Sequence, residues 1–100
     1  MLSDLKRTGR GFRFYEFKDR NDYLCTIQKS SVATEDCLWL GLESGSPKKL
    51  VFNEGWVPVD LPEGVELNTR MHLTREQAGI LAKQLKHFSE SGELPAIPAP

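Results

Sequence analysis

Hydrophobic and polar residues alternate in several short segments of the first half of the chain, and this period of two predicts β-strands. An aromatic run over 12–17 and a second run over 23–29 flank the polar segment 19–22, which predicts a β-hairpin. The more fully apolar segment 37–42 predicts a central strand, and a short strand can follow over 50–52. These segments predict a sheet built mainly from neighbouring antiparallel strands.

The second half of the chain changes character around its prolines. Pro58 and Pro62 exclude a central strand between 53 and 64, because proline has no N–H to donate to a ladder, so this segment is predicted as a loop or an edge. Trp56 within it is either a lid over the core or an exposed anchor. From 65 to 73 apolar and polar residues alternate cleanly, which predicts a long strand with one buried face.

A helix is predicted over 75–90. Thr74 and Gln77 have the spacing of a capping box, and Gly92 fits the left-handed residue beyond a helix end. The apolar stripe of this helix comprises Ala78, Leu81, Ala82, Leu85 and Phe88. The predicted fold class is therefore α+β: an antiparallel sheet of about four to six strands with one C-terminal helix packed on one face.

The chain has 100 residues, of which 39% are hydrophobic and 27% are charged, so we expect a single small domain over 1–94. Within it, 1–11 is predicted to be a flexible basic arm, and 95–100 a disordered proline-rich tail. No apolar run is long enough to span a bilayer and no signal-peptide pattern is present, so we expect a cytoplasmic protein. A chain this short has a thin core, and a homo-oligomer would be unsurprising.

Charge and cysteine content narrow the function classes. The formal net charge of −1 argues against a dedicated nucleic-acid binder. Cys25 and Cys37 each lie in an apolar stretch, so we expect reduced, buried thiols and neither a disulfide nor a metal site. No nucleophile elbow, phosphate-binding loop or dinucleotide motif is present, so we expect neither an enzyme nor a cofactor.

The hydroxyl-rich loop that follows the second strand, taken with two arginines, is a candidate ligand site. Arginine offers a planar fork to oxyanions, and serine hydroxyls can complete the set of donors for a phosphate. The candidate ligand-binding residues are Arg20, Gln28, Ser30, Ser31, Thr34, Arg70 and His72. The alternative is a loop that these side chains merely cap. Trp39 and Trp56 are candidates for an interaction surface.

Several strings in the chain resemble small uncharacterised proteins encoded by bacteriophages and prophages. They are Gln28-Lys29-Ser30-Ser31, Ala33-Thr34-Glu35-Asp36, Trp39-Leu40-Gly41, the run from Arg70 to Gln77, and Gly92-Glu93-Leu94, together with the single residues Arg20, Cys25 and Phe88. The resemblance covers roughly residues 14–42 and 70–94. It implies no particular activity. It implies a setting, the bacterial cytoplasm during infection or lysogeny, where such proteins act by binding.

Two hypotheses about function follow. The first is a non-catalytic accessory protein that binds a host macromolecule. The alternative is a protein that binds or sequesters a small ligand, either a phosphorylated metabolite or a nucleotide signal. An exposed apolar patch around Trp56 or Trp39 would favour the first, and an enclosed arginine-lined pocket would favour the second.

Overall fold

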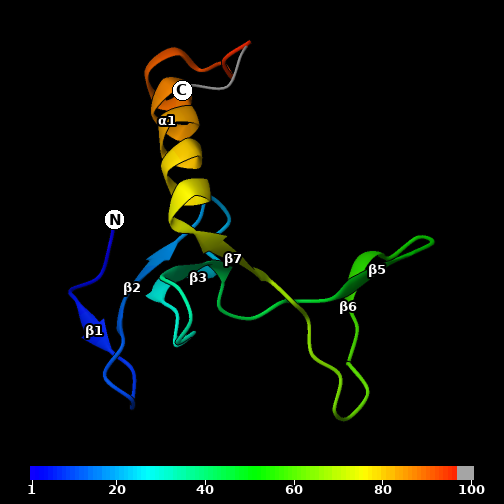
Figure 1. Ribbon diagram of the computed structural model, residues 1–100. Coiled ribbons are helices and arrows are strands. Elements are labelled where there is room, and N and C mark those ends of the chain that lie inside the picture. Colours follow the sequence, from blue (N-terminus) through cyan, green and yellow to red (C-terminus); the bar gives the residue numbers. More distant parts are fainter. Residues whose placement is uncertain (97–100) are drawn as a thin grey trace.

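A computed structural model describes residues 1–96 and shows an antiparallel sheet, a separate two-stranded hairpin and one helix (Figure 1). The five strands of the main sheet, in spatial order, are β1 (Lys6–Arg7), β2 (Arg13–Lys18), β3 (Leu24–Lys29), β4 (Cys37–Leu42) and β7 (Arg70–Thr74). The hairpin is β5 (Lys48–Val51) and β6 (Gly55–Pro58), and the helix is α1 (Arg75–Ser91). The α+β class is confirmed. Within residues 1–96, no helix is long and apolar enough to cross a bilayer.

The two faces of the main sheet differ in chemistry. Residues paired across neighbouring strands share a face, and successive residues alternate between faces. The register therefore places on one face Tyr15, Phe17, Cys25, Ile27, Leu38, Leu40, Leu42, Met71 and Leu73, with Lys29 at the end of β3, and we call this the apolar face. The other face carries Phe14, Glu16, Thr26, Gln28, Cys37, Trp39, Arg70 and His72, which together with Ser30 just beyond β3 we call the polar face.

Helix α1 begins with the predicted capping box. The Thr74 hydroxyl accepts a hydrogen bond from the Gln77 N–H at 3.1 Å, and the Gln77 side chain accepts one from the Thr74 N–H at 3.0 Å. The helix ends at Ser91 and is capped by Gly92, whose φ of 76° is left-handed. Both caps are confirmed.

The packing of α1 differs from the expectation that it covers one face of the sheet. No residue of α1 is buried, and the helix stands away from the sheet beyond its first turns (Figure 1). The reason is the connection: β7 ends at Thr74 and α1 starts at Arg75, so no loop lets the helix fold back over the sheet. Most of the apolar stripe of α1 therefore remains outside the contact with the sheet.

The long strand predicted over 65–73 is shorter in the structure and begins at Arg70. A strand needs a partner for its ladder, and β4 offers one only from Cys37 to Leu42. Before Arg70 the alternating residues lie in a loop, where the Thr69 hydroxyl donates to the Leu42 carbonyl at 2.8 Å. The alternating pattern in the sequence therefore continues over residues that have no neighbouring strand to pair with.

The hairpin of β5 and β6 extends away from the main sheet as an arm (Figure 1). Its two strands are both edges, which agrees with the prediction of a loop or an edge over 53–64 and accommodates Pro58. Its turn contains Asn53 at a φ of 65°. The Trp56 side chain is 68% exposed, so it is not a lid over the core.

The segment expected to be a flexible basic arm, 1–11, joins the sheet instead. Lys6 and Arg7 pair with β2 as the edge strand β1, and the Ser3 N–H donates to the Glu16 carbonyl at 2.8 Å. Lys6 also forms an ion pair with Glu16. Most of the predicted disordered tail, residues 97–100, lies outside the described residues.

Gly41 marks the closest approach between β4 and the chain entering β7. Its φ is 146°, and a Cβ at this position would lie 2.5 Å from the Thr69 carbonyl oxygen. Neither the backbone conformation nor the contact suits a side chain. Gly79, in α1, is the opposite case, because nothing lies within 4 Å of the Cβ that it lacks.

We therefore predict that Gly41→Ala lowers the free energy of unfolding by about 2 kcal/mol or more, because it adds both backbone strain and a clash. The matched control Gly79→Ala should raise it by about 0.5–1 kcal/mol, since alanine is the better helix former. Urea denaturation followed by circular dichroism measures both. A Gly41→Ala protein as stable as the wild type would contradict the close approach.

Candidate functional site

The polar face brings together side chains from three strands that are distant in sequence. Gln28 on β3, Trp39 on β4 and His72 on β7 occupy one row of the sheet, because Gln28 pairs with Trp39 and Trp39 pairs with His72. Arg70 lies two residues before His72 on the same face. The strand β4, which lies between β3 and β7, therefore carries an aromatic ring with polar side chains on both sides of it.

Trp39 is the centre of this cluster. Its ring stacks on the His72 imidazole, with the ring centroids 3.9 Å apart and the planes 8° from parallel. The Arg70 guanidinium lies over the same indole, 5.4 Å from the ring centroid, in a cation–π contact. One ring thus holds both a histidine and an arginine in fixed places on the surface.

Two hydrogen bonds cross the width of β4 and complete the cluster. Arg70 Nη1 donates to the Gln28 side-chain oxygen at 3.3 Å, and His72 Nε2 is hydrogen-bonded to the Ser30 hydroxyl at 2.9 Å. Both join residues 42 positions apart in the chain. We call Gln28, Ser30, Trp39, Arg70 and His72 the Trp39 cluster.

Ser30 has a second role in the loop that follows β3. Ser30 is buried, and its hydroxyl accepts a hydrogen bond from the Val32 N–H at 3.2 Å. This is the local capping that hydroxyl residues commonly provide in turns. The same side chain therefore fixes the start of the loop and orients His72.

A hollow of about 370 Å³ adjoins the Trp39 cluster at Gln28. Its wall continues the polar face towards the edge of the sheet, and its lining residues are Arg7, Thr8, Phe14, Glu16, Leu24, Thr26, Gln28 and Glu43. The Thr26 hydroxyl, which is buried, donates to the Glu43 carboxylate at 3.3 Å. The hollow offers cationic, anionic and hydroxyl groups within one open surface.

The cluster contains four of the seven candidate ligand residues. Arg20 is not among them: it lies in the turn between β2 and β3, where its guanidinium donates to the Asn21 side chain at 3.3 Å. Ser31 and Thr34 are exposed in the loop before β4.

The two tryptophans were expected only as an interaction surface. Trp39 instead lies beside His72, and this position depends on the pairing of β4 with β7, which no local sequence pattern reveals. Trp56 lies apart, on the β5–β6 arm.

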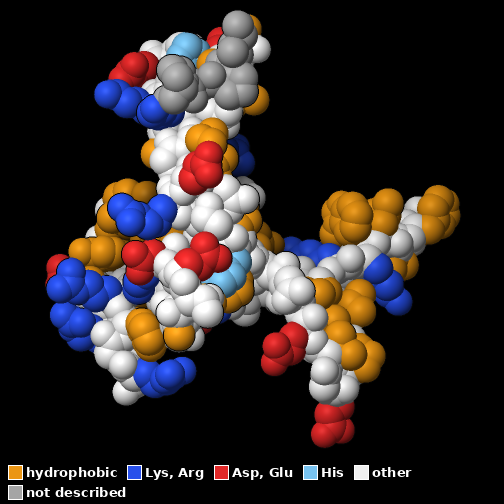
Figure 2. All heavy atoms as spheres, in the orientation of Figure 1, with side chains coloured by type: hydrophobic (Ala, Val, Ile, Leu, Met, Phe, Trp, Pro, Cys, Tyr) orange, Lys and Arg blue, Asp and Glu red, His pale blue; other side chains and the backbone are white. Residues whose placement is uncertain are grey.

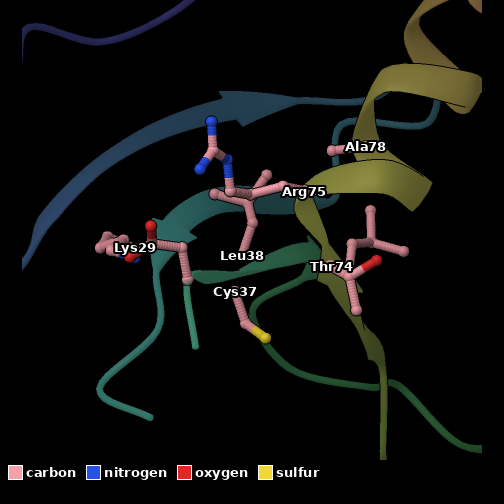
Figure 3. Close-up of a pocket in the computed structure, with 8 residues that line it drawn as sticks. Lys29, Cys37, Leu38, Thr74, Arg75 and Ala78 are labelled. Atoms are coloured by element: carbon pink, nitrogen blue, oxygen red, sulfur yellow. The ribbon is translucent and has the colours of Figure 1, made fainter. Parts of the chain in front are cut away.

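A second hollow, of about 170 Å³, lies where α1 meets the apolar face. Figure 3 shows Leu38 and Ala78 on the helix side of the sheet, whereas the Cys37 side chain points the other way. At its rim the Lys29 ammonium donates to the Asp36 carboxylate at 2.8 Å, and this hydrogen bond lowers the pKa of Asp36 below its usual value.

Within residues 1–96 no cluster of His, Cys, Asp and Glu is arranged to hold a metal ion.

Comparison with known proteins finds no matching family, no similar curated protein and no similar solved structure.

Both cysteines are free thiols and both are buried, as expected from their apolar surroundings. Burial raises the pKa of the Cys25 thiol, and the nearby Asp19 charge raises it further. Burial likewise raises the pKa of Cys37, with a further contribution from Glu35. A thiol reacts as its thiolate, so both effects reduce its reactivity near neutral pH.

We predict that both thiols react with a disulfide reagent at least about tenfold more slowly in the folded protein than in denaturant, because burial restricts access and disfavours the thiolate. Absorbance of the released thiolate measures the rate. Raising the pH should increase the rate in the folded protein towards the denatured value. Equal rates in both states near neutral pH would contradict the burial of these residues.

Proposed function

We propose that this chain is a non-catalytic binding protein whose Trp39 cluster holds a nucleotide or a related small aromatic phosphate. The observation that carries the proposal is the stacked pair of Trp39 and His72 with the Arg70 guanidinium beside it. A flat aromatic platform next to an arginine matches the two parts of a nucleotide, a planar base and an anionic phosphate.

The exposed face of the cluster has the chemistry that such a ligand needs. His72 is exposed and stacks on Trp39 through one face of its ring, so a base can stack on the other. Arg70 donates to Gln28 through one of its five N–H groups, which leaves other donors for phosphate oxygens. The Gln28 amide adds a further polar contact at the edge of the stack.

Charge on the polar face supports an anionic ligand at Arg70. The ion pairs within the described part of the chain are Lys6 with Glu16 and Lys29 with Asp36, so Arg70 is not neutralised by either. The adjoining hollow of about 370 Å³ lies within the size range of small-molecule sites. Glu43 on its rim can accept hydrogen bonds from sugar hydroxyls.

Binding without chemistry fits the setting that the resemblance to phage and prophage proteins implies. A small bacterial cytoplasmic protein that holds a phosphorylated metabolite or nucleotide signal would remove it from its receptor in the host. This action requires tight binding and no catalytic group, and the residues of the Trp39 cluster supply stacking, hydrogen-bond donors and charge.

We predict that a nucleotide quenches the fluorescence of Trp39 in a Trp56→Phe background, where Trp39 is the only tryptophan. Titration with adenine and guanine mononucleotides and cyclic dinucleotides, used as probes, measures the affinity. Arg70→Ala should weaken binding about tenfold to a hundredfold by removing a charge-assisted contact, and His72→Ala about tenfold by removing the stacking face.

Arg20→Ala is the matched control, because it removes the same charge from a turn outside the cluster. It should bind as the parent does. Native mass spectrometry of protein purified from a bacterial host adds an independent readout, namely extra mass in the nucleotide range that is lost on denaturation. No response to any probe and no such mass, or equal binding by the Arg70 and Arg20 variants, would contradict the proposal.

A second candidate function, binding of a host protein, is favoured by the β5–β6 arm. Figure 2 shows hydrophobic side chains gathered over this arm. Phe52 is 90% exposed and Trp56 68%, and Leu50 adds to the same surface. Exposed aromatic side chains on a projecting element are typical anchors at protein interfaces.

For this second function we predict that a Phe52→Ser/Trp56→Ser variant loses a host protein that the wild type captures from bacterial lysate. The substitutions remove the apolar anchors and leave the main sheet untouched. Arg70→Ala should retain the captured protein, because Arg70 is not part of the arm. Quantitative mass spectrometry of the captured material compares the three proteins, and equal capture by all three would contradict a role for the arm.

A further inference from the structure

The apolar face of the sheet and the apolar stripe of α1 have no covering layer in the described part of the chain. The buried hydrophobic residues of residues 1–96 are only Cys25, Cys37 and Leu73. On the sheet Met71 is 52% exposed, and on the helix Leu85 is 62% exposed. Apolar side chains arranged on one face of a sheet and one side of a helix are normally covered by another layer.

The size of the molecule shows how much surface is left uncovered. A compact chain of 11.3 kDa has an accessible area of about 5,700 Å² and, at 100 residues, a radius of gyration of about 13 Å. This chain has an area of 8312 Å² and a radius of gyration of 16.8 Å. The excess of about 2,600 Å² is spread over the whole molecule, the β5–β6 arm included, and it is of the same order as the 1,000–2,500 Å² or so that each subunit of an obligate dimer commonly buries.

The helix and the sheet form the two walls of one apolar corner. Leu38 of the sheet and Ala78 of α1 line the hollow where they meet (Figure 3), and Leu73 of the sheet is a further lining residue. By helical spacing Leu81 and Leu85 continue from Ala78 along the same side of α1, whereas Lys83, His87 and Glu90 lie on the opposite side. The corner therefore opens onto a helix side and a sheet face that are both apolar.

We propose that a second copy of this chain covers this corner, with the apolar side of its α1 packed against the apolar side of α1 and the apolar face of the sheet. A second copy is favoured over an unrelated partner because it carries a matching apolar surface, with the same exposed Met71 and Leu85. A symmetric pair covers the same exposed surface on both chains at once, because the apolar helix side and the apolar sheet face of each copy meet their counterparts on the other. The polar face, with the Trp39 cluster, lies on the other side of the sheet and remains accessible.

The test is the mass of the protein in solution, measured by sedimentation and native mass spectrometry across a range of concentrations. We expect the wild type at twice the 11.3 kDa chain mass or more. Leu85→Lys should weaken association by about a hundredfold or more, because each interface would bury two new charges. His87→Lys is the matched control: it introduces the same residue two positions away, on the opposite side of α1, and should associate as the wild type does.

Folding of the variants is checked by circular dichroism, and Leu85 is exposed enough in a single chain to accept lysine. Met71→Lys tests the sheet wall by the same measurement, so the proposal does not depend on one variant. A wild type that stays monomeric at all concentrations overturns the proposal. Association of both the Leu85 and Met71 variants as tight as that of the His87 control also overturns it.

Discussion

The pairing of β4 with β7 is the contact on which the rest of the molecule depends. β1 to β4 follow one another as neighbours, whereas β7 joins the sheet only after the arm and a long loop. Gly41 makes this pairing close, because the carbonyl of Thr69 occupies the space that a Cβ would need. The pairing places Arg70 and His72 against Trp39, and it sets the point from which α1 leaves the sheet.

Local features of the fold were predictable because their causes are local. The capping box at Thr74, the left-handed Gly92 and the hairpin of β2 and β3 depend on residues a few positions apart. The extent of β7 and the direction of α1 were not predictable in the same way. The extent of β7 depends on the length of a partner strand. The sequence does indicate the direct connection at Thr74, but the angle at which α1 leaves β7 there is visible only in the folded backbone.

In the candidate site, too, some features could be predicted from the sequence and others depend on the tertiary structure. Residue chemistry made Gln28, Ser30, Arg70 and His72 candidates, because amides, hydroxyls and guanidinium groups are recognisable in any sequence, and the structure brings these four together. Sequence could not show that Arg20 lies in a turn outside the cluster, nor that Trp39 lies between the two pairs. Which polar residues meet is decided by strand register across β4, and register is a tertiary property.

The two faces of this sheet are physically coupled: the polar face has to stay exposed to bind a ligand, and the apolar face has to be covered. A binding site built on side chains requires that those side chains stay in place, and the Trp39 cluster rests on a sheet only one layer thick. A single layer with one apolar face open to water is poorly held, since few of its side chains are buried. Covering the apolar face with a second copy would stiffen β4 and β7 together, because the same strands carry both faces. Self-association would then strengthen ligand binding on the opposite side of the sheet, with no residue shared between the two surfaces.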